Sequence, residues 1–150
     1  MKPTWILVAD SSRARIFTAA TPSAPLEELE DLTHPESREH EQELVTDLPG
    51  KHRNDTGIGA HGFQDEVEPK QQETLNFAKF LARHLDDNRK KNRFQRLILV
   101  AAPAFLGMLR NDLPDATRKT IIYTLDKNLT QHTPEDIRAH LPEYLPHDVA

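Results

Sequence analysis

One stretch of the chain combines the residue types that bind phosphate groups. It spans residues 47–64, reads DLPGKHRNDTGIGAHGFQ, and mixes glycines with cationic and imidazole side chains. The candidate contacts are Lys51, His52, Arg53, Gly57, Gly59, His61 and Gly62. Glycine allows close backbone approach and positive φ, and basic segments wrap phosphates. The stretch therefore predicts an RNA- or phosphate-binding segment, and the alternative is a surface loop that binds nothing.

A second candidate is a run of basic residues further along the chain. It consists of Arg89, Lys90, Lys91 and Arg93, followed by Arg96. Because the run follows a helical pattern, it also contains the cations that a helix C-terminus favours through its macrodipole. Two interpretations therefore stand side by side: stabilisation of the helix end, and contact with the phosphates of a nucleic acid.

Enzymatic chemistry finds little support in the residue pattern. The glycines match neither a Walker loop nor a dinucleotide fingerprint, since no lysine-plus-hydroxyl pair follows them. The chain has no cysteine, and no serine sits in a nucleophile elbow. We therefore expect no catalytic residue and no cofactor, and we favour a binding protein over an enzyme.

Two sets of side chains have the chemistry of metal ligands. The first comprises His40, His52 and His61 with Asp55 or Asp65, and its spacing matches no metal motif. The second comprises Asp10, Asp112 and Asp126, carboxylates of the kind that hold a metal for phosphodiester cleavage. Asp10 is also a good turn residue between two apolar runs, so a structural role is favoured. We expect no bound metal.

Composition and charge limit the class of protein. The 150 residues are 37% hydrophobic and 29% charged, which is typical of one globular domain. No apolar stretch is long enough to span a bilayer, and the N-terminus shows no signal-peptide cleavage pattern. The expected location is therefore the cytoplasm, without membrane insertion.

The net charge of −5 conceals an uneven distribution. Residues 27–47 hold nine acidic residues and one basic residue, a net charge of −8, so the rest of the chain carries +3. We interpret the acidic stretch as a solvated surface segment. The overall charge therefore does not exclude binding of a polyanion elsewhere on the molecule.

Two apolar runs without alternation, Trp5–Ala9 and Leu97–Ala102, predict adjacent strands that are covered on both faces. The turn residues after Ala9 predict a hairpin of residues 4–9 and 14–19. Residues 26–32 are ambiguous, because their leucines recur at a spacing that suits a helix. Residues 121–125 predict a strand or a helix end. The fold class expected is a single α/β domain with a mixed, hairpin-led sheet flanked by helices.

The helical patterns follow a long polar loop predicted at about residues 34–66. A helix is expected from Pro69 to about Asn88, with one apolar face and one polar face. The apolar face would hold Leu75, Phe77, Ala78, Leu81, Ala82 and Leu85, and the polar face Asn76, Lys79, Arg83 and Asp86. Shorter helices are expected at residues 104–111, after a cap at Asp115, and from a cap at Thr133 to about residue 140. Residues 1–142 would form the domain, and residues 143–150, among prolines, a flexible tail.

Four segments together resemble a known family. They are WILVADSSRARIF (5–17), APAFLGMLRNDLP (102–114), LDKNLT (125–130) and TPEDIRAHL (133–141). They look very like the bacterial host-attachment protein family, over nearly the whole chain apart from much of residues 33–68 and the tail. The family name refers to attachment to host cells, which we interpret as a phenotype and not as a mechanism.

The order of elements is also remotely similar to the middle domain of archaeal and eukaryotic class I peptide release factors. There, a hairpin-led sheet carries a long loop with Gly-Gly-Gln, and a long helix follows. Residues 47–64 correspond to that loop, but Gly-Gly-Gln is absent, since the glycines are separated and Gln64 follows Phe63. The resemblance implies an RNA- or ribosome-associated binding module without peptide release. The alternative is a protein-interaction or regulatory factor required for attachment indirectly, and the oligomeric state is left open.

Overall fold

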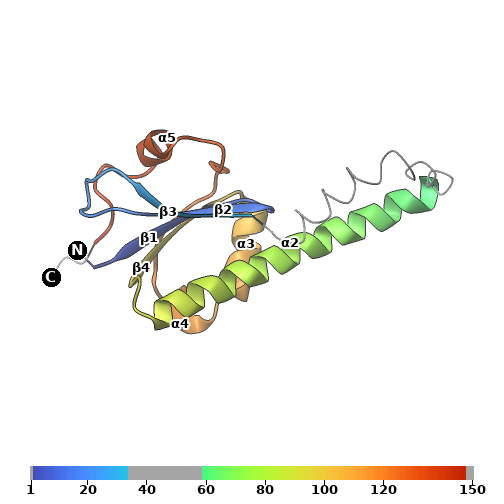
Figure 1. Ribbon diagram of the computed structural model, residues 1–150, viewed down its shortest axis with the longest axis horizontal. Coiled ribbons are helices and arrows are strands. Elements are labelled where there is room, and N and C mark those ends of the chain that lie inside the picture. The colour runs from blue at the N-terminus through green and yellow to red at the C-terminus, as the bar shows by residue number, and fades with distance from the viewer. Residues whose placement is uncertain (1, 34–58, 148–150) are drawn as a thin grey trace.

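Five strands form one mixed sheet at the centre of the computed structural model, which describes residues 2–33 and 59–147 and, for residues 59–70, the backbone alone. The strands are β1 (Thr4–Ala9), β2 (Arg13–Thr18), β3 (Glu27–Thr33), β4 (Arg96–Ala101) and β5 (Ile121–Leu125). Their order is β3-β2-β1-β4-β5 (Figure 1). β1 pairs antiparallel with β2 and parallel with β4, and β5 is parallel to β4. This confirms the expected hairpin-led α/β fold.

The two apolar runs are the central strands of the sheet. β1 and β4 lie side by side in parallel, with Leu7 opposite Leu99, and all six residues of each strand are buried. A strand that is covered on both faces needs no polar alternation, which is why both runs are continuous in the sequence. The prediction of two adjacent buried strands is confirmed.

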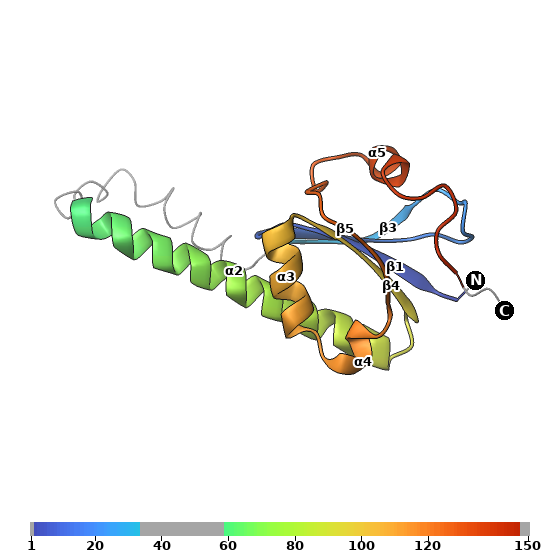
Figure 2. The ribbon, with the colours of Figure 1, turned by 180° about the vertical axis from the view of Figure 1, so that it is seen from behind.

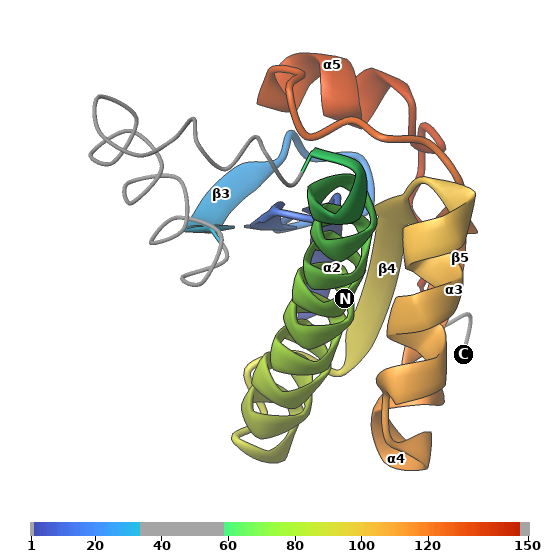
Figure 3. The ribbon, with the colours of Figure 1, turned by 90° about the vertical axis from the view of Figure 1, so that its right-hand side faces the viewer.

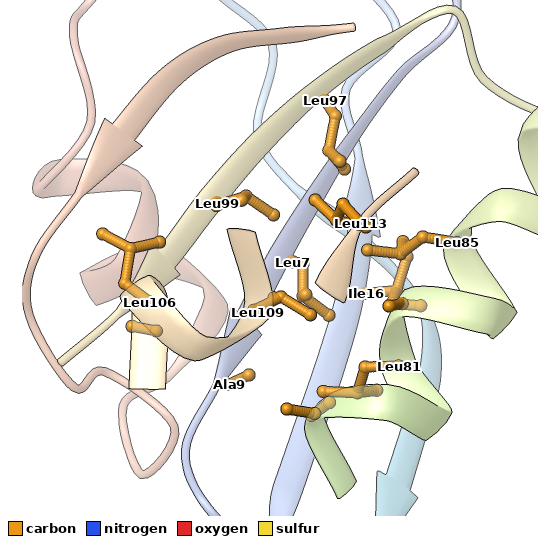
Figure 4. Packing of buried hydrophobic residues seen from close by; sticks show 14 of the residues in the cluster. Leu7, Ala9, Ile16, Leu81, Leu85, Leu97, Leu99, Leu106, Leu109 and Leu113 are labelled. Carbon is orange, nitrogen blue, oxygen red and sulfur yellow. The ribbon is translucent and has the colours of Figure 1, made fainter. Parts of the chain in front are cut away.

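Helices cover both faces of the sheet. α2 (Gly59–Lys90), α3 (Pro103–Asp112) and α4 (Asp115–Arg118) lie on one face, and α5 (Pro134–Ala139) lies on the other (Figure 2). On the first face, Leu81 and Leu85 of α2 and Leu109 of α3 pack towards Leu7 and Leu99 of the central strands (Figure 4). We call residues 71–93 and 103–120 the helical layer; residues 59–70 of α2 are not counted in it.

The C-terminal segment belongs to the core of the opposite face. Leu145 is fully buried there with Ile137 and Leu141, and its backbone N–H donates to the Pro22 carbonyl at 2.8 Å. The Arg138 guanidinium also donates to the carbonyl oxygens of Pro22, Ala24, Pro142 and Glu143. The packed chain therefore continues beyond residue 142, where the prolines predicted a flexible tail. Arg138 holds this segment in place because it bonds both to residues 22–24 and to residues 142–143.

The ambiguous residues 26–32 form the edge strand β3. Its acids pair with arginines of the neighbouring strand: Arg15 with Glu28 at 2.9 Å, and Arg13 with Asp31 at 2.8 Å. The hydrogen bonds and charge of Arg13 hold the pKa of Asp31 below its ordinary value. Strand pairing of opposite charges explains why a segment so rich in acid joins a sheet.

Helix α2 is longer than its sequence pattern predicts and reaches beyond the sheet (Figure 1). It lies beside α3 (Figure 3). It begins at Gly59, ten residues before Pro69, which lies within it. An interior proline removes one intrahelical donor and clashes with the preceding turn, which is why the sequence pattern predicted the helix start at Pro69. Residues 59–66 of the predicted loop are therefore helical, and residues 34–58 lie outside the described part of the chain.

Two predicted faces of α2 need correction. Leu75 is exposed, and Phe77 is the first buried side chain among those described on this helix. Asp86, expected to face away from the core, is buried because α4 covers it. The other predicted apolar residues, Phe77, Ala78, Leu81, Ala82 and Leu85, are all buried.

The short helices fall close to their predicted positions. α3 covers the expected residues 104–111, residues 121–125 form strand β5, and Thr133 caps α5 by accepting from the Asp136 N–H at 3.1 Å. Asp115 is not a cap, because Pro114 takes that position and Asp115 is the first residue of α4. Among the described residues, no helix is long and apolar enough to cross a membrane.

Candidate nucleic-acid interface

The end of α2 gathers basic side chains within a tight change of chain direction. Asn92 adopts a left-handed conformation, with φ of 61°, immediately after the helix. The N–H of Arg93 then donates to the carbonyl of Asn88 at 3.0 Å, which closes the helix end. Asparagine tolerates this backbone conformation better than most residues. The turn therefore displays Lys90, Lys91 and Arg93 together before the chain enters β4.

A buried carboxylate organises this end of the helix. The Asp86 side chain is 12% exposed, and its Oδ1 accepts from the Thr117 hydroxyl at 2.6 Å and from Arg89 Nη2 at 3.0 Å. Arg89 Nε also donates to the Thr117 hydroxyl at 2.9 Å, and Lys90 lies 3.2 Å from Asp86 Oδ2. These hydrogen bonds, that of Thr117 first, lower the pKa of Asp86 to about 2 against the effect of burial.

The same contacts bring α4 beside the end of α2. Thr117 is fully buried against α2, and the next two residues, Arg118 and Lys119, are exposed. Arg118 Nη2 donates to the Leu113 carbonyl at 2.8 Å, which orients its guanidinium at the surface. We name this surface the basic corner, and define it as Arg89, Lys90, Lys91, Arg93, Arg118 and Lys119.

The basic corner carries an excess of positive charge. Residues 86–93 and 115–119, which contain the corner, hold six basic residues and the three acidic residues Asp86, Asp87 and Asp115, a net charge of +3. Asp86 is withdrawn from the surface and hydrogen-bonded to Thr117 and Arg89, whereas the Lys90 side chain is 63% exposed. The exposed charge at this corner is therefore predominantly cationic.

Charge separates across the whole sheet. The helical layer holds nine basic and five acidic residues, a net charge of +4. Across the sheet and along its edge, β3 and residues 126–147 hold eight acidic and two basic residues, a net charge of −6. The net charge of the helical layer therefore favours a polyanion, although the whole chain is negative.

The predicted site residues fall into three groups. Arg89, Lys90, Lys91 and Arg93 lie together at the basic corner, but Arg96 is buried in β4. Lys51, His52, Arg53 and Gly57 lie outside the described residues. Gly59, His61 and Gly62 were expected in a loop and instead begin helix α2.

The sequence analysis missed two residues of this surface as candidates. Arg118 and Lys119 follow the predicted basic run by more than twenty residues, and no sequence pattern joins them to it. They reach the corner because Thr117 packs on Asp86. The sequence would have indicated this contact only if the two helices had been predicted to pack together with Thr117 opposite Asp86.

The set of Asp10, Asp112 and Asp126 receives no support from the described residues, and the side chains of the histidine set, His40, His52 and His61 with Asp55 or Asp65, lie outside them. Asp10 Oδ1 accepts from the N–H groups of Ser12 and Arg13 at 2.9 and 2.8 Å, and its Oδ2 accepts from the Thr130 hydroxyl at 2.8 Å. It is therefore the turn residue of the hairpin, as the structural interpretation predicts. Within the described part of the chain, no three His, Asp or Glu side chains form a cluster that would hold a metal.

The fold and its charged surface define a small α/β protein whose mixed sheet lies between the helical layer and the C-terminal segment with α5. The chain belongs to the family described as "Protein required for attachment to host cells", whose sequence model matches residues 5–141. This confirms the family resemblance carried by the segments at residues 5–17 and 102–141.

Comparison with solved structures finds a distant neighbour. The chain is similar to the archaeal translation termination factor aRF1, with a TM-score of 0.46 and 13% sequence identity. The match covers 92% of this chain and 37% of that one, so the chain spans little more than a third of the neighbour. A search among curated proteins finds no match.

Proposed function

We propose that this protein is a non-enzymatic module that binds the phosphate backbone of RNA, free or on the ribosome, through the basic corner. The observation that carries the proposal is the convergence of two segments, residues 89–93 and 118–119, on one cationic surface. Neither segment alone distinguishes a ligand site from a stabilised helix end. Their convergence extends the cations beyond the helix end that the macrodipole stabilises.

The internal contacts of the corner support this role. Arg89 and Lys90 are partly engaged with Asp86, so they stabilise the fold as well as the surface charge. Lys91 and Lys119 are exposed on either side of that network. Phosphate contacts carry no base information, so binding is expected to be largely independent of RNA sequence. Lys51, His52, Arg53 and the neighbouring glycines are proposed as additional contacts.

The experiment is a salt titration of RNA affinity by fluorescence anisotropy, with a single-stranded RNA and nuclease-treated protein. Neutralised phosphates release counterions, so the logarithm of the association constant should fall linearly with the logarithm of salt concentration. Lys91→Gln and Lys119→Gln should each make that slope shallower by about 0.7 unit, the value for one lost single-strand contact. Lys127→Gln is the matched control, because Lys127 is an exposed lysine outside the helical layer.

Two results would overturn the proposal. One is an equal slope for Lys91→Gln, Lys119→Gln and the Lys127→Gln control. The other is undetectable RNA binding at low salt while the protein still co-purifies with a protein partner after nuclease treatment. In the second case, the alternative of a protein-interaction or regulatory factor replaces RNA binding, and the basic corner is a stabilised helix end.

A further inference from the structure

Among the described strands, β3 lies at one edge of the sheet and has a strand partner on one side alone. Within the part of the chain that the structure describes, β3 pairs only with β2, so one side of the strand remains open. Five of its seven residues are exposed, whereas all five residues of β5, the other edge strand, are half-buried. Open N–H and C=O groups along an edge are able to pair with another strand. β3 is therefore the more accessible edge of the sheet.

Two exposed apolar side chains, Leu29 and Phe80, lie on or close to the same edge. Among the described residues, four large apolar side chains are exposed, and three of them, Leu29, Leu75 and Phe80, lie on β3 or on α2. His84 of α2 contacts Glu30 of β3 at 2.8 Å, and the Phe80 ring stacks on His84 at a centroid distance of 6.0 Å. The helix therefore holds Phe80 close to the strand, with its ring 37% exposed.

The charge of the edge determines which strand fits there. β3 carries Glu27, Glu28, Glu30 and Asp31, and Arg13 and Arg15 neutralise two of them. A net charge of −2 remains, and opposite charges in adjacent strands stabilise their pairing. A second copy of β3 would place acids against acids, which is unfavourable. A basic extended segment is therefore the complementary occupant.

We propose that β3 is a docking edge for an extended basic peptide of a partner protein, which adds to the sheet as a further strand. Main-chain hydrogen bonds to β3 supply part of the affinity, as in other cases of strand addition. Side chains on one face of the added strand meet Phe80, and basic side chains meet the carboxylates of β3. The site is separate from the basic corner and does not depend on RNA binding.

The test measures binding of a labelled peptide of alternating lysine and valine, about eight residues long to match a typical strand. Fluorescence anisotropy with the full chain, freed of nucleic acid by nuclease, gives the dissociation constant. Phe80→Ser and Glu27→Gln should each weaken binding by about threefold, the effect of one lost cross-strand contact. Tyr144→Ser and Glu143→Gln are the matched controls, since Tyr144 is 64% exposed and Glu143 is also exposed, both on the C-terminal segment.

Three further measurements define the mode of binding. The same peptide methylated at alternate backbone nitrogens should lose binding, because it can no longer donate to β3. A peptide of alternating glutamate and valine should not bind. Lys91→Gln should leave peptide binding unchanged, which separates this site from the RNA proposal.

Several results would overturn the inference. If the methylated peptide bound as tightly as the unmodified basic peptide, strand addition would be excluded. If the acidic peptide bound equally well, selection by charge would be excluded. Concentration-dependent dimerisation that Phe80→Ser abolishes would assign the edge to a second copy of the chain. Tighter peptide binding after Lys51→Gln and Arg53→Gln would assign it to the chain's own basic segment.

Discussion

Asp86 was predicted on the exposed face of its helix and is buried in the structure. Its spacing from Arg89 and Lys90 is that of intrahelical ion pairs on a solvent-facing surface, which is how the sequence pattern places it. The structure buries it, because the Thr117 hydroxyl from α4 donates to its carboxylate at 2.6 Å. The contact joins residues 31 positions apart and could not be inferred from local spacing.

The buried carboxylate predicts a loss of stability in acid. The pKa of Asp86 is lowered to about 2 from an ordinary value of 3.8, so its stabilisation is fully present above about pH 5. It is lost as the pH falls towards 2, when the folded protein must also take up the proton. Asp86→Asn should reduce the free energy of unfolding at pH 7 by on the order of 2 kcal/mol and weaken its dependence on pH below 5.

Urea unfolding followed by circular dichroism, at a series of pH values between 7 and 3, measures this effect. Asp87→Asn is the control, since Asp87 is the adjacent exposed acid on the same helix. An equal loss for the two variants, or an unchanged pH dependence in Asp86→Asn, would contradict the role of the buried carboxylate.

At the level of elements, strands were predictable where burial alone selects their residues. β1 and β4 are apolar throughout because both of their faces are covered. β3 was not predictable in the same way, since its acids are compensated by Arg13 and Arg15 of a different strand. The start of α2 was also missed, because Pro69 resembles a helix beginning although the helix continues through it. For β3, partners distant in sequence therefore determine the structure.

The C-terminal segment behaves as an element of the core. Leu145 and its neighbour Tyr144 allow a direct comparison, because the first is buried and the second is 64% exposed. Leu145→Ala should lower the free energy of unfolding by about 2–5 kcal/mol, the range for a buried leucine. Tyr144→Ala should change it by less than about 0.5 kcal/mol, as for most surface substitutions. Chemical denaturation of both variants provides the measurement, and equal stabilities would show that the segment is a loose tail.

Across the whole molecule, the sheet separates two charged regions. The candidate surface was predictable in part, since the run at residues 89–93 is basic in sequence. Its full extent was not, because Arg118 and Lys119 join it only through the packing of α4 on α2. The acidic β3 and residues 126–147 lower the net charge without lying in the helical layer. Net charge is therefore a poor guide to which ligands this protein attracts.

This separation predicts that position, and not total charge, governs binding to a polyanion. Lys91→Glu with Arg118→Glu lowers the net charge by four units within the basic corner and should abolish retention on a heparin column at low salt. Glu135→Lys with Glu143→Lys raises it by four units at exposed positions across the sheet. That second variant should elute close to the unmodified protein, because charges separated by more than a Debye length of about 10 Å at 0.1 M salt are largely screened. Elution salt concentration, compared for variants with matched circular dichroism spectra, is the measurement. A rise in retention for Glu135→Lys with Glu143→Lys as large as the loss in the first variant would show that the protein responds to its total charge.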